Sequence, residues 1–353
     1  MLNKTPQKVR LRGLVKKMKN KFVNIPIFVP HKGCPNDCSF CNQRKITGAS
    51  DTMTPHLAEE IIEKHLLTVD RNTSHVQIAF FGGSFTGISR NEQKELLEVA
   101  SRYVLSGQVD GVRISTRPDY INREILEFLK EYGVKTIELG VQSMIDKVLV
   151  ANDRGHSAKT AEDASFLIKE YGFELGLQMM TGLYSDDYKG AIRTAKKIIE
   201  LKPSCVRIYP TLTIKDTKLE KLYNEGRYVP MTLDETVSLC AELLEMFEEA
   251  EISVLRVGLL GTDNINEKAD VVAGPFHQAI GELAESEKFY NLALRKIFEC
   301  GKKQIKIYVN PRYISTAIGH RKKNIIRFND LKEIEKIELL QNDNVAYGSF
   351  VLE

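Results

Sequence analysis

Val76-Gln77-Ile78-Ala79-Phe80-Phe81 is a nearly continuous apolar run, and Gly82-Gly83-Ser84-Phe85 follows it directly. An apolar run of this length is typical of a strand that is buried on both faces, as in a parallel sheet. The sudden change to glycine and serine marks the point where the strand ends and a loop begins. Such loops hold the functional residues of parallel barrel folds, so this junction is also a candidate site.

Five further runs have the same character as 76–81. They are residues 25–29, 112–115, 136–141, 173–180 and 206–209. Amphipathic stretches lie between the runs, and two of them begin with clear helix start signals. Thr54-Pro55 places a capping hydroxyl before a proline at the first helical position, and Ser89-Arg90-Asn91-Glu92 has the pattern of a capping box. Further helices are predicted near residues 122–132, 159–171, 187–201 and 232–250.

Six strands that alternate with helices predict an α/β fold. Crossovers between parallel strands are right-handed, so successive units curl in the same direction. The expected architecture is a partial (βα)6 TIM-like barrel over residues 23–255. Residues 1–22 form a basic N-terminal segment, and residues 256–353 are expected to form a smaller C-terminal α+β extension packed on the barrel. A strand near 252–257 and a helix near 282–300 are predicted in the C-terminal part.

The composition excludes several classes of protein. Of the 353 residues, 42% are hydrophobic and 27% are charged, which is ordinary for a globular protein and unlike a disordered chain or a collagen-like repeat. The apolar runs are too short to cross a bilayer, and the first residues lack the apolar core of a signal peptide. We therefore expect a cytoplasmic protein that has no disulfides and no membrane partner.

The net charge of +3 hides a strong asymmetry along the chain. Residues 1–22 and 301–329 each contain eight Lys and Arg and no Asp or Glu. The remaining residues therefore carry a net charge of −13. Basic segments of this kind are typical of proteins that bind an anionic partner such as nucleic acid. Tyr308 and Tyr313 lie among the cations of the second segment, as in surfaces that stack on unpaired bases. Arg321-Lys322-Lys323 is the candidate contact with RNA, and a solvated charged face is the alternative.

Three cysteines, Cys34, Cys38 and Cys41, follow the first predicted strand with the spacing CxxxCxxC. Three thiolates on one tight loop suit an iron–sulfur cluster, and a four-iron cluster would keep one iron free to bind a small molecule. A structural zinc site is the alternative, with His31 as the fourth ligand. The remaining cysteines are scattered singly, and core packing is expected for them. They are Cys205, Cys240 and Cys300.

These residues together resemble a known family. The motif CxxxCxΦC, with Phe40 as the aromatic residue, resembles the radical S-adenosylmethionine (SAM) superfamily, and the pair Gly82-Gly83 strengthens the resemblance. A closer similarity, over residues 23–290, is to the radical core of the Elongator catalytic-subunit family. It rests on His31-Lys32-Gly33-Cys34-Pro35, Phe81-Gly82-Gly83-Ser84-Phe85, Thr116-Arg117-Pro118-Asp119, Glu138-Leu139-Gly140-Val141-Gln142-Ser143, Arg154-Gly155-His156, Val272-Ala273-Gly274-Pro275 and Gly281-Glu282-Leu283. Coproporphyrinogen dehydrogenases share the GVQS and Arg-x-His pieces.

The resemblance implies a [4Fe-4S] cluster held by Cys34, Cys38 and Cys41, with SAM bound at the open iron. Reductive cleavage of SAM would then give a 5′-deoxyadenosyl radical. In this picture a guanidinium fork meets the SAM carboxylate, and glycines let the backbone approach the methionyl amino group. The residues implied to bind SAM are Phe40, Gly82, Gly83, Thr116, Gln142, Arg154 and Gln178.

Full-length members of this family also carry an acetyltransferase domain, which needs a glycine-rich turn for the pyrophosphate of acetyl-CoA. No such turn follows residue 255, so we expect a radical core without that domain. The resemblance and the basic segments favour tRNA or another RNA as the substrate, with a flavodoxin or ferredoxin as the electron donor. The alternatives are radical SAM chemistry on a small molecule or peptide, for example of the porphyrin type, and a non-catalytic RNA-binding or zinc module.

Overall fold

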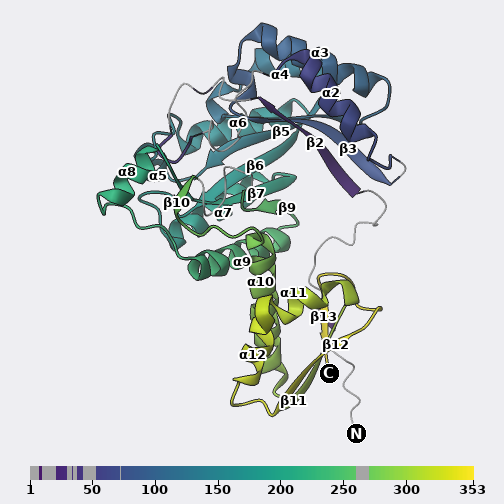
Figure 1. Cartoon of the computed structure of the whole chain (residues 1–353), viewed down its shortest axis with the longest axis vertical. Coiled ribbons are helices and arrows are strands. Elements are labelled where there is room, and N and C mark those ends of the chain that lie inside the picture. Colours follow the sequence, from purple (N-terminus) through teal and green to yellow (C-terminus); the bar gives the residue numbers. More distant parts are fainter. Residues whose placement is uncertain are drawn as a thin grey trace. The chain divides into compact units, whose positions relative to one another are not determined.

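The computed structural model describes residues 8–9, 21–29, 34, 38–42, 53–71, 73–259 and 270–353. The chain divides into two compact units (Figure 1). The larger unit comprises residues 16–232 and 252–276, and the smaller unit comprises residues 1–15, 233–251 and 277–353. Helix α9 (Leu233–Glu249), which precedes the predicted boundary at residue 255, therefore belongs to the smaller unit.

A seven-stranded parallel sheet forms the larger unit, and its strands lie side by side in the order of the sequence. They are β2 (Lys21–Val29), β3 (Ser74–Gly82), β4 (Gly111–Thr116), β5 (Val134–Gln142), β6 (Glu174–Thr181), β7 (Cys205–Pro210) and β9 (Ser253–Val257). The sheet curls but leaves β2 and β9 as its edges, which confirms the predicted partial barrel (Figure 1). All six predicted strands are present. The strand predicted near 252–257 is β9, and it is a seventh strand of this sheet because it pairs in parallel with β7.

Helices alternate with these strands at the predicted positions. They are α2 (Pro55–Leu66), α3 (Arg90–Leu105), α4 (Arg123–Glu131), α6 (Ala158–Glu170) and α7 (Tyr188–Leu201). The two predicted caps are confirmed. Thr54 Oγ1 accepts a hydrogen bond from the Leu57 amide at 3.2 Å, and Ser89 and Glu92 cap each other's backbone amides. The sequence analysis did not predict two short helices, α5 (Asp146–Ala151) and α8 (Lys218–Asn224).

The two faces of the sheet differ in character because side chains alternate along each strand. One face is apolar and closely packed, with Ile78, Ile114 and Ile137 all fully buried. The opposite, inner face carries polar and charged side chains, among them Arg113 and Glu138. The predicted strands are therefore buried on both faces, but the inner face of the partial barrel is polar.

The smaller unit is an α+β structure with its own core. Its four-stranded sheet has the order β1 (Lys8–Val9), β13 (Phe350–Leu352), β11 (Gln304–Val309) and β12 (Lys336–Gln341). Three helices, α10 (Ile280–Cys300), α11 (Ile314–Ile318) and α12 (Lys323–Asn329), join it together with α9. Phe289, Ile307 and Phe350 are fully buried at the centre of this core. None of the helices in the described part of the chain has the length and apolar character needed to cross a bilayer.

Candidate active site

A cavity of the larger unit lies where the parallel strands end. All ten residues predicted to bind the cluster and SAM line it: Cys34, Cys38, Phe40, Cys41, Gly82, Gly83, Thr116, Gln142, Arg154 and Gln178. Three more lining residues were not predicted, namely Ser115, Arg117 and Gly140. Most of these residues come from the cysteine loop and from the carboxyl-terminal parts of neighbouring strands, where a site was predicted. Arg154 is the exception, because it lies in the loop after α5 (Asp146–Ala151).

The cysteine loop is fastened to distant parts of the chain. Ser39 Oγ donates a hydrogen bond to Asn152 Oδ1 at 2.7 Å, and the Ser39 amide donates to the Asn152 carbonyl at 3.1 Å. The Ser39 carbonyl accepts a hydrogen bond from the Leu219 amide at 2.7 Å, at the start of α8. Phe40 packs against the apolar cluster that contains Leu219 and Tyr228. The short helices α5 and α8 therefore help to fix the position of the loop.

Arg154 is buried and reaches one of the cysteines. Its Nη1 donates to Cys38 Sγ at 3.1 Å, and its Nη2 donates to the Gly140 carbonyl. His156 Nε2 lies 3.3 Å from Nη2, while His156 Nδ1 faces the Ser157 carbonyl at 3.2 Å. These partners require a neutral imidazole that donates through Nδ1 and accepts through Nε2. Burial, followed by the charge of Arg154, lowers the pKa of His156 to about 4, so the ring is neutral at pH 7.

Two backbone positions at the cavity have positive φ angles. Gly82 has φ +115°, and a Cβ placed there would lie 2.5 Å from the Val29 carbonyl oxygen, so only glycine is accommodated. Gln142 has φ 67° and follows a register irregularity between β5 and β6. A left-handed backbone in a residue with a side chain is strained and is found preferentially at functional sites. The strand end is thus shaped to turn Gln142 toward the cavity that it lines.

Arg117 is a site residue that the sequence analysis missed, although it lies in the quoted Thr116-Arg117-Pro118-Asp119. Its Nε and Nη2 donate to the two Asp119 carboxylate oxygens at 2.9 and 2.8 Å, and Nη2 also donates to the Arg154 carbonyl at 2.6 Å. The Thr116 hydroxyl lies 2.7 Å from Ser84 Oγ and 2.6 Å from Thr86 Oγ1. Thr116 lines the cavity, but its hydroxyl is already engaged with two other hydroxyls.

The polar atoms of the cavity suit a cluster with a polar ligand beside it. Three buried atoms have no hydrogen-bond partner among the described residues, namely Arg117 Nη1, Gln142 Oε1 and Arg154 Nε. Buried polar groups are normally paired, so unpaired ones at one cavity point to a missing ligand. Desolvation and the nearby Cys38 raise the pKa of the Cys34 thiol, whereas Arg117 and Arg154 oppose the rise. Arg117 and Arg154 thus place positive charge beside Cys34 and Cys38, which favours an anionic cluster at these thiols.

The zinc alternative requires a tight set of ligands for one ion. In the described residues, which include Cys34, Cys38 and Cys41, no group of three His, Cys, Asp or Glu side chains is arranged to hold a single metal ion. The proposed fourth ligand, His31, lies outside the described residues.

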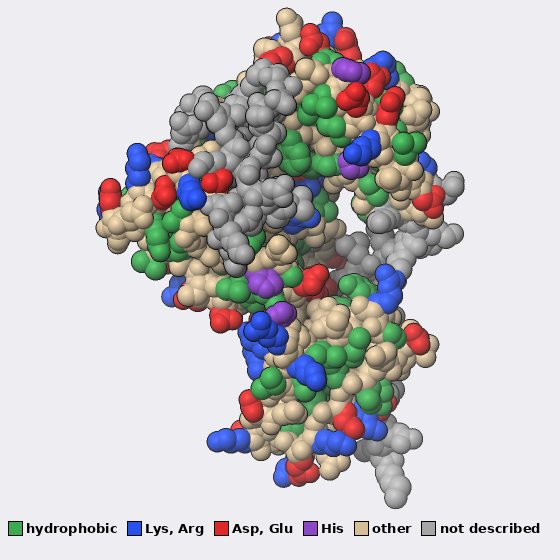
Figure 2. Space-filling view, in the orientation of Figure 1, with side chains coloured by type: hydrophobic (Ala, Val, Ile, Leu, Met, Phe, Trp, Pro, Cys, Tyr) green, Lys and Arg blue, Asp and Glu red, His purple; other side chains and the backbone are tan. Residues whose placement is uncertain are grey.

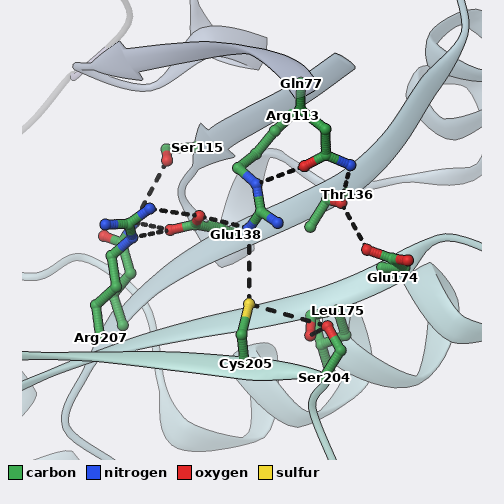
Figure 3. A network of polar contacts seen from close by, with 11 residues as sticks. Gln77, Arg113, Ser115, Thr136, Glu138, Glu174, Leu175, Ser204, Cys205 and Arg207 are labelled. Carbon is green, nitrogen blue, oxygen red and sulfur yellow. Dashed lines mark hydrogen bonds and ion pairs between the residues drawn. The ribbon is translucent and has the colours of Figure 1, made fainter. Parts of the chain in front are cut away.

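A network of buried charges lies on the inner face beside the cavity (Figure 3). Glu138 is only 1% exposed and accepts hydrogen bonds from Arg113 Nη1 at 2.7 Å and Arg207 Nε at 2.8 Å. Gln178, which lines the cavity, donates to the same carboxylate at 2.9 Å and to Ser115 Oγ at 3.3 Å. Burial would raise the pKa of Glu138, but Arg207, Arg113 and Gln178 outweigh it and the pKa is lowered. The network fixes the orientation of Gln178 in the wall of the cavity.

The predicted RNA contacts lie in the smaller unit, whose visible face carries several Lys and Arg side chains (Figure 2). Arg321, Lys322 and Lys323 are all exposed, and Lys323 also pairs with Asp234 at 3.4 Å and with Glu287 at 3.9 Å. The prediction for Tyr313 was wrong, because its ring is 1% exposed and packs in the core of this unit.

Tyr347 is an exposed aromatic residue that the sequence analysis missed. Its side chain is 59% exposed, and the Arg312 guanidinium lies 5.8 Å from the ring centroid. Of the basic residues in 1–22, only Lys8 and Lys21 lie within the described residues.

Comparison with known proteins identifies the family. The family described as the radical SAM superfamily matches residues 28–198, and the radical SAM C-terminal domain matches residues 203–289. An uncharacterized protein of Methanocaldococcus jannaschii is 30% identical over 240 residues, which cover 65% of this chain and 73% of that protein. The chain belongs to the radical SAM superfamily. It is a radical SAM enzyme whose cavity is formed by the residues predicted from the family motifs.

Two relatives of this radical SAM enzyme carry names that refer to Elongator or to tRNA modification. Elongator complex protein 3 of Mus musculus is 33% identical over 142 residues, which cover 38% of this chain and 25% of that protein. A tRNA uridine(34) acetyltransferase of M. jannaschii is 25% identical over 205 residues, which cover 52% of this chain and 38% of that protein. The matches thus span about a quarter to two fifths of these two relatives.

A solved structure agrees with the fold. The archaeal Methanocaldococcus infernus Elp3 superposes on this chain with a TM-score of 0.60 at 20% sequence identity. The superposition covers 84% of this chain and 67% of the Elp3 chain. The fold therefore extends over both units of the radical SAM enzyme.

Proposed function

We propose that this radical SAM enzyme holds a [4Fe-4S] cluster through Cys34, Cys38 and Cys41 and binds SAM beside it. The observation that carries the proposal is the single cavity lined by all ten predicted residues. The unpaired Gln142 Oε1 and Arg154 Nε further support a polar ligand there. When bound, the cluster and SAM together supply a 5′-deoxyadenosyl radical by reductive cleavage of the sulfonium bond.

The chain's own residues have separate tasks in this proposal. Arg154 offers its unpaired Nε to the SAM carboxylate, since its Nη atoms are already held by Cys38, Gly140 and His156. Gly82 keeps the strand end free of a side chain. Gln178, oriented by Glu138 and Ser115, offers an amide toward the ribose hydroxyls. Gln142 directs its amide into the cavity, and Phe40 covers the adenine.

Anaerobic reconstitution tests this part of the proposal. The reconstituted wild-type protein is expected to contain about four iron and four sulfide per chain, the content of one four-iron cluster. After reduction it is expected to convert SAM slowly to 5′-deoxyadenosine and methionine without substrate. Protein that binds zinc in place of iron, or that forms no 5′-deoxyadenosine, would contradict the proposal.

We further propose that the substrate is tRNA, and that a flavodoxin or ferredoxin supplies the electron in the cytoplasm. Support comes from the relatives named for tRNA uridine(34) acetylation, from the exposed pair Arg321 and Lys322, and from Tyr347 beside Arg312. An exposed ring among cations suits stacking on an unpaired base. Replacing Arg321 and Lys322 together by alanine should weaken tRNA binding and reduce its dependence on salt.

The matched control for this variant is Lys323→Ala, because Lys323 already pairs with two carboxylates of its own unit. We expect it to change tRNA affinity less than the double variant does. Filter binding over a range of salt concentrations provides the measurement. Absence of any salt-dependent tRNA binding by the wild-type protein would reject RNA and favour a small molecule or peptide.

A further inference from the structure

A row of register partners crosses four strands on the inner face of the sheet. Gly140 on β5 pairs with Gln178 on β6, Gln178 pairs with Arg207 on β7, and Arg207 pairs with Arg256 on β9. Gly140 and Gln178 line the cavity. Neighbouring strands lie about 4.8 Å apart, so the backbone of Arg256 is roughly 10 Å from that of Gln178. The row therefore leads from the cavity to two adjacent arginines.

Arg207 and Arg256 differ in whether a carboxylate neutralises their charge. Arg207 donates through Nε and Nη2 to both oxygens of Glu138, at 2.8 and 3.2 Å, and shares this carboxylate with Arg113. Arg256 is half-buried and forms no ion pair or hydrogen bond with the residues that the structure describes. Like charges on register partners repel, and partial burial strengthens the repulsion. Glu138 is shared by Arg113 and Arg207, so the charge of Arg256 on the neighbouring strand β9 is not balanced by this carboxylate.

The Arg207 side chain is held in place by contacts with Phe81 and Glu138. Its guanidinium carbon lies 5.2 Å from the centroid of the Phe81 ring, and its side chain is 12% exposed. Glu138 and Phe81 therefore hold one guanidinium rigidly, while the neighbouring Arg256 keeps its donors free of described partners. Arg256 can therefore donate two parallel hydrogen bonds to an oxyanion such as phosphate, and the charge of the neighbouring Arg207 adds to the attraction.

We propose that Arg256, with Arg207 beside it, binds a phosphate group of the RNA nucleotide that enters the partial barrel. This inference rests on the proposed RNA substrate and adds the position at which the substrate is held. Enzymes that modify a base take the nucleotide out of its stack, and that nucleotide carries its own backbone phosphate. The roughly 10 Å between Gln178 and Arg256 is comparable to the length of a nucleoside, so the base end would reach the cavity.

Filter binding of a purified tRNA pool at a series of salt concentrations tests this proposal with full-length protein. Arg256→Gln is expected to lower the slope of log affinity against log salt by about 0.7 to 0.9, the contribution of one phosphate contact. Arg256→Lys keeps the charge and should retain the wild-type slope. The matched control is Arg123→Gln, whose side chain is 64% exposed on α4 and pairs with Glu170. Thermal melting and iron content check that each variant is folded.

The outcomes separate this proposal from the one it rests on. A reduced slope in Arg256→Gln, with wild-type slopes in Arg256→Lys and Arg123→Gln, supports the phosphate site. An unchanged slope in Arg256→Gln overturns the site but leaves RNA as the substrate. If the wild-type protein shows no salt-dependent tRNA binding, both the RNA substrate and the phosphate site are rejected.

Discussion

Ser39 and Asn152 are joined by two hydrogen bonds, although 113 residues separate them in the sequence. Ser39 lies between two of the cysteines that line the cavity, and Asn152 follows α5 and is fully buried. Asn152 also donates from Nδ2 to the carbonyls of Val148 and Tyr184. One buried amide therefore ties the cysteine loop to two other segments of the larger unit.

Asn152→Ala should lower the iron content of the reconstituted protein, because Ser39 loses the partner of its hydroxyl and the loop loses one anchor. Removing one partner of a buried hydrogen bond costs about 1–3 kcal/mol. Iron and sulfide analysis provides the measurement. Asn122→Ala is the control, since this residue caps α4 away from the cavity and its loss costs about 1 kcal/mol of stability. Equal iron content in both variants would show that the anchor is not needed for the cluster.

Cys34→Ala, Cys38→Ala and Cys41→Ala should each abolish the visible absorbance of the cluster and all formation of 5′-deoxyadenosine. The thiols of Cys205, Cys240 and Cys300 lie away from the cavity lining, so alanine at those positions should preserve both signals. Absorbance and product analysis on six single variants give the answer. A requirement for any of the last three thiols would refute the ligand assignment.

Arg154→Ala should weaken SAM binding by about 1–3 kcal/mol, as expected when a charge-assisted hydrogen bond is lost. Arg154→Lys should also bind weakly, because one ammonium group cannot reach Cys38, Gly140 and a ligand together. Equilibrium binding of SAM to the reconstituted variants measures the change. Arg102→Ala, an exposed arginine paired with Glu59, serves as the control. Wild-type affinity in both Arg154 variants would remove this residue from the SAM site.

Glu138→Gln should destabilise the larger unit by about 3–5 kcal/mol, since two buried arginines would lose their shared carboxylate. The pKa of Glu138 is lowered from its usual value of 4.5, so its stabilising effect is present above that pH and is lost as the pH falls through the lowered pKa. Urea unfolding at pH 7 measures the difference. Glu170→Gln, which breaks an exposed pair with Arg123, should cost no more than about 1 kcal/mol. Similar losses in the two variants would contradict the burial argument.

His156 should make the protein less stable in mild acid. Its pKa is lowered from 6.5 to about 4, so the unfolded chain takes up a proton at a higher pH than the folded chain does. The free energy of unfolding should therefore fall by up to about 3 kcal/mol as the pH decreases from 7 to 4. In His156→Gln this part of the pH dependence should disappear. Urea unfolding of the wild-type protein and of His156→Gln between pH 7 and 4.5, above the range in which most carboxylates titrate, provides the measurement. The same pH dependence in both proteins would contradict the role of His156.

The sequence predicted the partial barrel well because its signals are local. The apolar runs are long and nearly continuous, and the caps at Thr54 and Ser89 are formed by neighbouring residues. Helices α5 and α8 escaped prediction because six or seven residues are too few to show a helical period.

Side-chain placement depended on contacts far apart in the sequence. Glu138 pairs with Arg113 and Arg207, 25 and 69 residues away, and no local pattern marks these charges as buried partners. Tyr313 looked exposed because Arg312 and other cations surround it, but tertiary packing turned its ring into the core.

The link between Ser39 and Asn152 also sets an order of events during protein synthesis. A ribosome adds about 5–20 residues per second, so the cysteine loop emerges roughly 6 to 23 seconds before the residue that anchors it. During that interval strands β6, β7 and β9, which follow Asn152 in the sequence, have not yet joined the sheet. Iron that reached the cysteine loop before Asn152 had been made would therefore meet a loop that lacks this anchor.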